Sequence, residues 1–556
     1  MAAIRGAPVP ARVFFHFFRI CRTAVLLRPA RGASHHRARR RWLIAAFLVA
    51  IWLPVHSACA QQLRQLRFEG NAVLSESELQ AAVAPFLGAP LSLQRLNDAT
   101  AAVQALYQGR GYLFATAVIP QQDVVDGSVR IAVFEGRLGS VRVRGTAGSD
   151  APPAASAWLA ARLPPGVVLG KAALDDTAWL AAAMFGWHVR FNAVTGADVG
   201  SVDLETEVVA TRDARSKGEV SVDNYGSRQL GVGRMQLRLD RNDLFAAGDR
   251  LTVFALQSER RESLFGGVSY GGYLNSGGLR AFGSVTRSIG TVGDQFAALQ
   301  AVAIGDTVEA GLTQPIVRSD TGMAEAGATL EDKRFASSML GNAVQGNHLR
   351  VMRARLAGAL WAPGAGMEAA AVTSVGQNRI TLPAAAAADQ ADGGFHAQGR
   401  FARLQVDWRG NLVPASGWLL DTRLAGQWAS GNLDGSEKFG LGGPGRVRAA
   451  SVTAALGDAG VFASAELSRD LSASLPAAQR LSVSTFYDAG RVQRNRMPGN
   501  VPASERELAN RVSRHGAGLG LKLAANGWSA NLEYAVPFGA ARSEGPQTWL
   551  SLSLGF

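Results

Sequence analysis

Cysteine is almost absent from this chain of 556 residues, since only Cys21 and Cys59 are cysteines and both precede residue 61. If the segment before residue 61 is removed, the mature protein has no thiol. Disulfide bonds, thiol catalysis and cysteine metal sites are then excluded together. Long apolar runs are also missing, because no later stretch approaches the roughly 18 apolar residues of a membrane-spanning helix. A membrane location would therefore require a closed barrel, since only helices and barrels satisfy their backbone groups in lipid.

The first 60 residues read as a secretory signal with an extended basic region. They contain ten arginines, no lysine and no acid, so their removal lowers the net charge from +13 to +3. Twelve apolar residues at 42–53 precede small residues at 58–60, which predicts that the mature chain begins at Gln61. A lipid anchor on Cys59 is the alternative, but His56 stands where a lipoprotein signal prefers an aliphatic residue. Because the excess positive charge lies in the leader, nucleic-acid binding is not expected.

Residues 61–137 and 138–212 read as two similar α+β units, each with the order βααββ. In the first, Ser75 and Glu78 form a capping box before a helical apolar stripe. Repetition of one supersecondary pattern in series indicates a duplicated module. The strands are expected at 63–68, 113–119 and 128–134, and in the second unit at 138–144, 188–194 and 202–209.

From residue 213 to Phe556 the helical period gives way to alternation of apolar and polar residues, as in Met235, Leu237 and Leu239. Alternation alone fits a soluble sandwich as well as a membrane barrel. The secretory signal, the lack of cysteine and the terminal aromatic favour an antiparallel transmembrane β-barrel. The length accommodates about sixteen strands at roughly ten residues each plus connections, with residues 294–316 forming one strand or two.

The connections in this region alternate between short and long. The turn at 275–277 is tight, whereas 379–394, 431–458 and 491–513 are long and irregular. Barrels of the outer membrane have short periplasmic turns and long external loops. The alanine-rich residues 384–388 are interpreted as a loop tip.

Several motifs occur in a recognisable order. Gly111, Tyr112, Pro120, Glu135 and Gly136 stand in a stretch that resembles a polypeptide-transport-associated (POTRA) domain. Three later segments, at 222–228, 441–448 and 486–490, resemble the barrel start, the inserted loop and the paired strand motif of one family. That family is the haemolysin secretion/activation (ShlB/FhaC/HecB) group of two-partner secretion transporters, or TpsB-type transporters. The loop motif includes Gly442, Gly443, Pro444, Val447 and Arg448.

The resemblance implies two periplasmic POTRA domains and a sixteen-stranded barrel in the bacterial outer membrane, with an inserted loop at about 431–458. It implies recognition of one large secreted partner in the periplasm and export of that partner through the pore. The partner would be an adhesin, a cytolysin or a toxin. No cofactor is implied. Outer-membrane lipids and the barrel assembly machinery are the other expected partners, and Phe556 fits the terminal signal which that machinery reads.

Strand parity places Asp488 in the lumen, together with Arg480, Ser482 and Ser484. An acid there is expected to hold Arg448 of the inserted loop by charge-assisted hydrogen bonds. Glu466 also projects inward and either joins this network or is a solvated lumen acid. The chain departs from the family where Ala449 and Ala450 replace a glycine and an aromatic residue, which puts the loop tip in question. A plug helix is not expected between Gln61 and the first strand.

The remaining features favour structural interpretations. Glu135 and Gly136 lie at the join of the two units, where the glycine is expected to serve a turn. No catalytic or metal site is expected, because the four histidines beyond the leader are widely separated and no HExxH, GxSxG or Walker pattern occurs. The alternatives to an exporter are an assembly factor for outer-membrane proteins, a passive porin and an adhesive surface barrel. An assembly factor more often has additional POTRA units, and a porin needs no helical module at 63–210.

Overall fold

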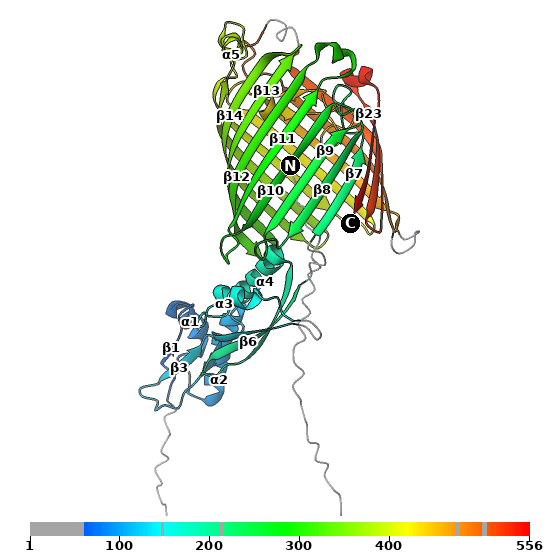
Figure 1. Cartoon of the computed structure of the whole chain (residues 1–556). Coiled ribbons are helices and arrows are strands. Elements are labelled where there is room, and N and C mark those ends of the chain that lie inside the picture. Colours follow the sequence, from blue (N-terminus) through cyan, green and yellow to red (C-terminus); the bar gives the residue numbers. More distant parts are fainter. Residues whose placement is uncertain (1–60, 146–149, 211–215, 320, 473–478, 503–508) are drawn as a thin grey trace, which may run out of the picture. The chain divides into compact units, whose positions relative to one another are not determined.

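The computed structural model describes residues 61–145, 150–210, 216–319, 321–472, 479–502 and 509–556. It contains two three-stranded α/β units followed by a closed barrel of sixteen antiparallel strands (Figure 1). The predicted fold class is therefore confirmed. The expected signal peptide concerns residues 1–60, which lie outside the described part.

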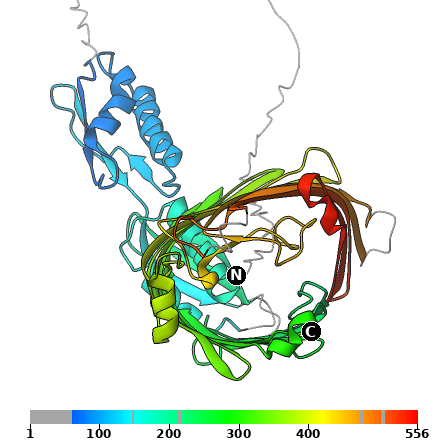
Figure 2. The ribbon, with the colours of Figure 1, turned by 90° about the horizontal axis from the view of Figure 1, so that it is seen from above.

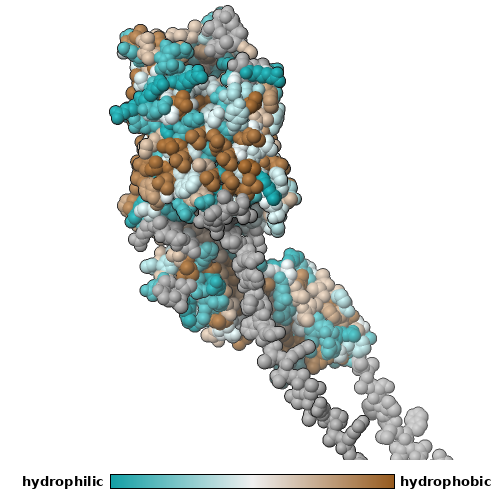
Figure 3. All heavy atoms as spheres, turned by 90° about the vertical axis from the view of Figure 1, so that its right-hand side faces the viewer, coloured by the Kyte–Doolittle hydropathy of each residue, from teal (hydrophilic) through white to brown (hydrophobic). Residues whose placement is uncertain are grey.

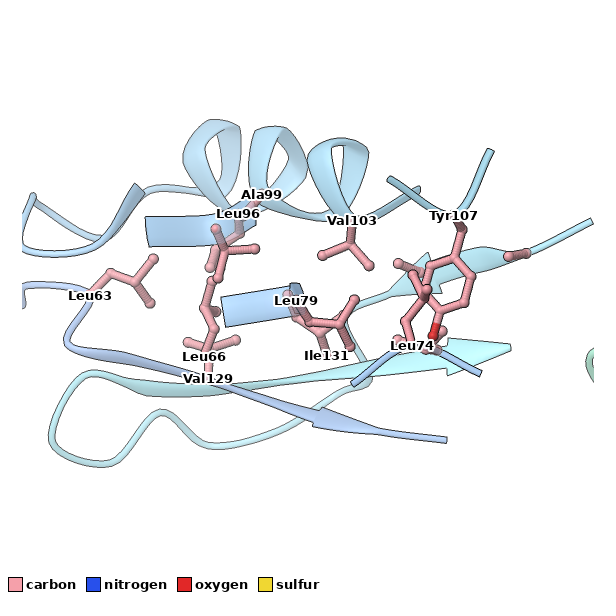
Figure 4. Packing of buried hydrophobic residues seen from close by; sticks show 14 residues of the cluster. Leu63, Leu66, Leu74, Leu79, Leu96, Ala99, Val103, Tyr107, Val129 and Ile131 are labelled. Atoms are coloured by element: carbon pink, nitrogen blue, oxygen red, sulfur yellow. The ribbon is translucent and has the colours of Figure 1, made fainter. Parts of the chain in front are cut away.

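The first α/β unit has β3 at the centre of its sheet, parallel to β1 and antiparallel to β2. Ser75 and Glu78 form the predicted capping box at the start of α1, and Ser92 caps α2. Apolar residues of both helices and of the sheet meet in one buried core (Figure 4). The elements are β1 (Gln65–Glu69), α1 (Glu76–Val83), η1 (Ala84–Phe86), α2 (Leu93–Gly109), β2 (Thr116–Val118) and β3 (Ser128–Phe134).

The second α/β unit repeats this order, with β6 parallel to β4 and antiparallel to β5. Gly186 ends α4 in the left-handed conformation (φ 70°), which glycine adopts without strain. No helix within the described ranges is long and apolar enough to cross a membrane. The elements are β4 (Arg137–Arg144), α3 (Ala155–Arg162), α4 (Lys171–Phe185), β5 (Trp187–Thr195) and β6 (Ser201–Ala210).

The barrel closes where β24 pairs antiparallel with β7, from Ser551–Asp223 to Gly555–Glu219. Every other neighbouring pair is also antiparallel and follows the chain order. The strands are β7 (Ser216–Asp223), β8 (Arg234–Asn242), β9 (Arg250–Ser258), β10 (Ser263–Tyr273), β11 (Arg280–Thr291), β12 (Val302–Ser319), β13 (Gly322–Met339), β14 (Asn342–Ala362), β15 (Ala365–Ile380), β16 (Gly399–Leu412), β17 (Trp418–Ala429), β20 (Ala459–Asp470), β21 (Gln479–Gln493), β22 (Arg511–Ala525), β23 (Trp528–Pro537) and β24 (Gln547–Gly555).

Apolar side chains cover the outer surface of the barrel. Leu330, Leu356 and Leu519 are 57–65% exposed, and an apolar band with hydrophilic residues above it is visible on the face in Figure 3. The alternate residues of the same strands point inward and are polar or charged, as at Glu331 and Lys333. This inverted arrangement is that of a lipid-embedded barrel and excludes a soluble sandwich with an apolar interior.

Two local expectations are refined by the structure. Residues 294–316 form a short helix, η2 (Asp294–Leu299), and a single strand, β12, instead of two strands. The alanine-rich segment belongs to a long connection, as expected, but it is a helix, α5 (Pro383–Gln390), and not an irregular tip. Alanine has the highest helix propensity and Pro383 is tolerated in the first turn, which accounts for this helix.

Candidate functional site: the inserted loop and its anchors

The connection between β17 and β20 lies inside the ring of barrel strands (Figure 2). It forms a narrow hairpin in which β18 (Phe439–Gly440) pairs with β19 (Leu456–Gly457). Near it stands a short helix, η3 (Gly435–Glu437). The tip of this connection carries the motif 441–448.

Arg448 projects from the loop tip into a group of carboxylates on the barrel wall. Its Nε and Nη2 donate to Oδ2 and Oδ1 of Asp488 at 2.8 and 3.0 Å, which makes the pair bidentate. Its Nη1 donates to Glu466 Oε2 at 2.7 Å and to Glu533 Oε1 at 3.0 Å. Arg448 therefore connects the loop to β20, β21 and β23 at once.

The surroundings of this cluster fix the position of the arginine. The guanidinium carbon lies 3.3 Å from the centre of the Phe486 ring, a cation–π contact. The backbone amide of Arg448 also donates to Asp488, at 3.0 Å, while its carbonyl accepts from Trp549 Nε1 at 2.7 Å. Lys522 on β22 pairs with Glu466 at 2.9 Å. Both side chain and backbone of Arg448 are thus held by the wall.

The substituted loop-tip residues, Ala449 and Ala450, are fully packed. They are 1% and 0% exposed, in a cluster with Leu441 and Phe486. A Cβ added at Gly516 on β22 would overlap the Cβ of Ala449. The alanines therefore match a wall that leaves little space opposite them.

The other residues of the loop motif shape the tight turn at its tip. Gly443 has a φ of 101° and donates to the carbonyls of Val447 and Ala450, so that it requires the freedom of glycine. A side chain at Gly442 would overlap the carbonyl oxygen of Ser451. Pro444 continues the turn, and Val447 is completely buried. Together these residues direct Arg448 toward the wall.

A second ionic cluster holds the base of the loop, and here the loop supplies the acid. Glu437 is 0% exposed. Its carboxylate pairs with Lys333 at 2.9 Å, Arg353 at 3.2 Å and Arg403 at 3.0 Å. These cations stand on β13, β14 and β16, and Glu331 on β13 pairs with both Lys333 and Arg353. We call Glu437 and its three cations the base anchor. Its barrel residues stand on different strands from the carboxylates that bind Arg448.

The two ends of the loop are also joined to each other. Asp458 is buried and accepts from the backbone amides of Leu433 and Arg496, at 3.1 and 2.8 Å. Its Oδ1 lies 3.0 Å from Lys438 Nζ. The base of the loop is therefore a closed network, and its geometry does not depend on Glu437 alone.

The POTRA motif residues take structural positions in the first α/β unit. Glu135 is 3% exposed and accepts from the amides of Ala72 and Val73 at 2.6 and 2.8 Å, and from the Tyr107 hydroxyl at 3.0 Å. Burial raises the pKa of the Tyr107 phenol, and the Glu135 carboxylate adds to this effect. Gly136 has a φ of 74°, and a side chain there would contact Phe114. Gly111 has a φ of 88°, with Tyr112 beside Tyr107 and Pro120 just beyond β2.

Phe556 is 68% exposed and lies at the seam of the barrel. Its amide donates to the Gly218 carbonyl at 2.9 Å, and its carbonyl accepts from the Gly218 amide at 2.8 Å. A side chain at Gly218 would overlap the aromatic ring. The terminal aromatic side chain is therefore displayed at the closing strand pair.

The sequence predicted the contact between Arg448 and Asp488, left open whether Glu466 joins it, and gave no indication of Glu533 or of the base anchor. Glu533 alternates with apolar residues in the same way as Asn531, so the sequence indicates that it faces the lumen. The sequence does not indicate that it lies close to the inserted loop. Glu437 lies in an irregular segment without periodic alternation of apolar and polar residues, so the sequence does not indicate where its side chain points. Within the described ranges no three or more His, Cys, Asp or Glu residues are grouped as a metal site would require.

A sixteen-stranded barrel with an inserted, ion-paired loop and two preceding POTRA-type units defines the class of outer-membrane protein transporters. The model of the POTRA domain, ShlB-type, matches residues 62–136. The model of the haemolysin secretion/activation protein ShlB/FhaC/HecB matches residues 204–523, more than half of the chain. The chain therefore belongs to the haemolysin secretion/activation protein ShlB/FhaC/HecB family.

Individual relatives agree with this assignment. The chain is 23% identical over 504 residues to the heme/hemopexin transporter protein HuxB of Haemophilus influenzae, covering 88% of this chain and 86% of the relative. It is 25% identical over 224 residues to the outer membrane transporter CdiB of Dickeya dadantii, covering 39% and 38%. The structure of CdiB from Escherichia coli has the same fold, with a TM-score of 0.72, 19% identity and coverage of 91% and 93%.

The family fixes the general function that the sequence predicted. The protein is an outer-membrane transporter that recognises a large secreted partner in the periplasm through its POTRA domains. It exports that partner through the barrel pore, and its N-terminal domains lie in the periplasm.

Proposed function

We propose that the inserted loop closes the resting export pore and that its two ionic anchors have different roles. The tip anchor, formed by Arg448 with Asp488, Glu466 and Glu533, is the part that releases when the client enters. The base anchor at Glu437 remains paired and serves as the hinge. The observation that supports this division is the four-residue ion cluster at the tip, which depends on a single loop side chain.

The electrostatics support release at the tip. Buried ion pairs cost several kcal/mol of desolvation per ion and specify geometry more than they add stability. When the arginine leaves, water can enter and solvate the three acids, so the cluster has two accessible states. The base differs because Asp458 and the backbone amides of Leu433 and Arg496 hold it independently of Glu437.

The periplasmic units are proposed to bind the client by β-augmentation, in which an extended segment adds a strand to an exposed sheet edge. The outer strands of the two sheets are β1 and β2 in the first unit and β4 and β5 in the second. Recognition of this kind reads the backbone more than the side chains. We place the unit boundaries at residues 137 and 212, shortly after the last strand of the first sheet ends at Phe134 and shortly before the first barrel strand begins at Ser216.

The client is proposed to be a large secreted adhesin, cytolysin or toxin, encoded next to this protein. Both relatives carry transporter names, heme/hemopexin transporter protein and outer membrane transporter. Export in this scheme has no catalytic step and uses no cofactor. Phe556, displayed at the seam, is proposed as the signal for the barrel assembly machinery, with outer-membrane lipids as the surrounding partner.

The role in export is tested by expressing the adjacent large secreted protein with and without this transporter. We expect the client to reach the medium or the cell surface only when the transporter is present, and to remain in the periplasm otherwise. Release that is equal in both strains would contradict the export of this client. A general loss of other barrel proteins from the outer membrane would instead favour an assembly factor.

A further inference from the structure

Charged residues form a continuous row across the outer surface of five neighbouring barrel strands. Each member of this row is the cross-strand partner of the next, so that neighbouring side chains start roughly 5 Å apart. A second row lies one outward position away on β13 to β16. The first row is Arg287, Asp306, Arg334, His348 and Arg379, and the second is Asp332, Arg350, Gln377 and Arg400.

These side chains point away from the lumen. They share strand parity with Leu330, Met352 and Val375, which are apolar and 50–63% exposed. The opposite parity belongs to Glu331 and Lys333, which pair with each other inside the barrel, where Lys333 also pairs with Glu437 of the inserted loop. The two rows are therefore on the surface that faces the membrane.

On β13 to β16 the rows also mark a boundary along the strands. On one side of it the outward positions are apolar or small, and the last large ones are Leu330, Met352, Val375 and Leu404. On the other side, toward the long connection between β15 and β16, the charged and polar members of the two rows occupy the outward positions. On β11 and β12 apolar residues flank the first row on both sides, with Val285 and Val308 on one side and Ile289 and Ile304 on the other. Since the long connections of such barrels are external, the rows lie where the hydrocarbon core meets the headgroups of the outer leaflet.

The charge at this boundary is strongly positive. Five arginines stand against two aspartates, so the rows carry a net charge of +3 with His348 neutral. Asp332 lies 3.3 Å from Arg334, 3.4 Å from Arg350 and 2.8 Å from His348, which holds these side chains side by side. Arg379 and Arg400 pair with no carboxylate among the described residues, and both are exposed.

We propose that these five arginines, the arginine ladder, bind the phosphate groups of a phosphorylated glycolipid in the outer leaflet. Guanidinium groups offer paired donors that match phosphate oxygens in a bidentate manner. Clusters of basic residues at a membrane surface attract anionic headgroups. The alkyl stems can lie along the apolar surface below while the charged ends remain at the headgroups. The ladder thus anchors the wall formed by β11 to β16 in one leaflet.

The test uses the full-length mature protein in detergent, with bound glycolipid counted by native mass spectrometry. The probes are lipopolysaccharide, the same molecule after removal of its phosphates, and inorganic phosphate. The test variant is Arg379→Gln with Arg400→Gln, because neither arginine has a carboxylate partner to leave behind. The matched control is Arg241→Gln with Arg469→Gln. These two arginines also face outward, but they lie near the end of the barrel opposite to the arginine ladder.

The wild type and the control are expected to bind lipopolysaccharide equally. The test variant should bind it roughly tenfold more weakly, since charge-assisted contacts are lost. The dephosphorylated form should bind the wild type as weakly as the intact form binds the test variant. Unchanged binding by the test variant, or equal binding of the dephosphorylated form, would overturn the proposal. Inorganic phosphate binding as tightly as the glycolipid would also overturn it, because the ligand would then not be a lipid. Heat-modifiable electrophoretic mobility shows separately that each variant is folded.

Discussion

At the scale of single residues, the charges around the loop tip are unequal, and Arg448 is what brings them close to balance. Three carboxylates face Arg448 and Lys522, and Lys522 is 46% exposed. Without Arg448, three acids in the wall would share one partly solvated lysine. The loop position and the ionisation of the wall therefore depend on each other.

The same residues show what a sequence can and cannot predict. The Arg448–Asp488 contact was predicted from two motifs, and the structure places their atoms within hydrogen-bond distance. The inward parity of Glu466 was readable from its strand. Glu533 stands on β23, two strands away from Asp488, and only the register and tilt of the closed barrel bring it to Nη1 of Arg448. Such a long-range relation has no local signal.

Steric fit at the tip leads to a first prediction. Gly516→Ala places a methyl group against Ala449 and the Val536 carbonyl oxygen, and overpacking of this kind costs about 1–3 kcal/mol. We expect the loop to be displaced and the variant to show more frequent channel openings in planar bilayers. The control is Gly426→Ala on β17, where an added Cβ meets no atom closer than 3.8 Å. Equal opening frequencies in the two variants would argue against a close-packed tip.

At the scale of elements, two ionic contacts on different strands hold the inserted loop, and the loop contributes the positive charge to one and the negative charge to the other. Its tip offers a cation to β20, β21 and β23, and its base offers an acid to β13, β14 and β16. The sequence pattern indicated a long irregular connection at 431–458, because the alternation of the strands stops there, and the family resemblance implied that this connection is inserted into the pore. The base anchor was not predicted, since an irregular segment does not show which wall it approaches.

A second prediction concerns the base anchor. Glu437→Gln leaves Lys333 and Arg353 paired with Glu331 alone and removes the carboxylate that pairs with Arg403. Breaking a buried pair costs about 3–5 kcal/mol. The loop of this variant should be cut faster by an added protease, while the barrel keeps its heat-modifiable mobility. Glu309→Gln is the matched control, because Glu309 also faces the lumen but bonds Ser284 and not the loop. A cleavage rate equal to that of the control would rule out Glu437 as an anchor.

At the scale of the whole molecule, two periods in the sequence account for most of the fold. The helical period predicted the two βααββ units, and the period of two together with the length of the region predicted about sixteen barrel strands, of which the structure has sixteen. Alternation alone does not show whether the polar face of the sheet or the apolar one points outward. The membrane location was therefore predicted from the secretory signal, the lack of cysteine and the terminal aromatic residue. The helix α5 was missed for a related reason, since the same alanines suit an exposed tip and a short helix.

A third prediction separates the two parts of the chain. Deletion of 63–136 removes the first unit and the sheet edges that are proposed to bind the client. We expect client export to fall to background, while the truncated barrel still reaches the outer membrane and shows heat-modifiable mobility. The comparison is a full-length chain carrying Glu135→Gln, which should retain export if Glu135 has only a structural role and the unit remains folded. Undiminished export by the deletion variant would refute docking through this unit.

The central claim is that Arg448 holds the resting loop and that its release belongs to export. The most direct measurement is the export rate of the client by Arg448→Ala, compared with Arg409→Ala at equal amounts of folded barrel. Arg409 is a lumenal arginine that pairs with Asp421 at 3.0 Å and does not contact the loop. We predict that Arg448→Ala lowers export at least about tenfold, because its loss leaves three wall carboxylates without their shared partner and the loop without the fixed resting position from which it is released, while Arg409→Ala exports normally. Normal export by Arg448→Ala would contradict the claim.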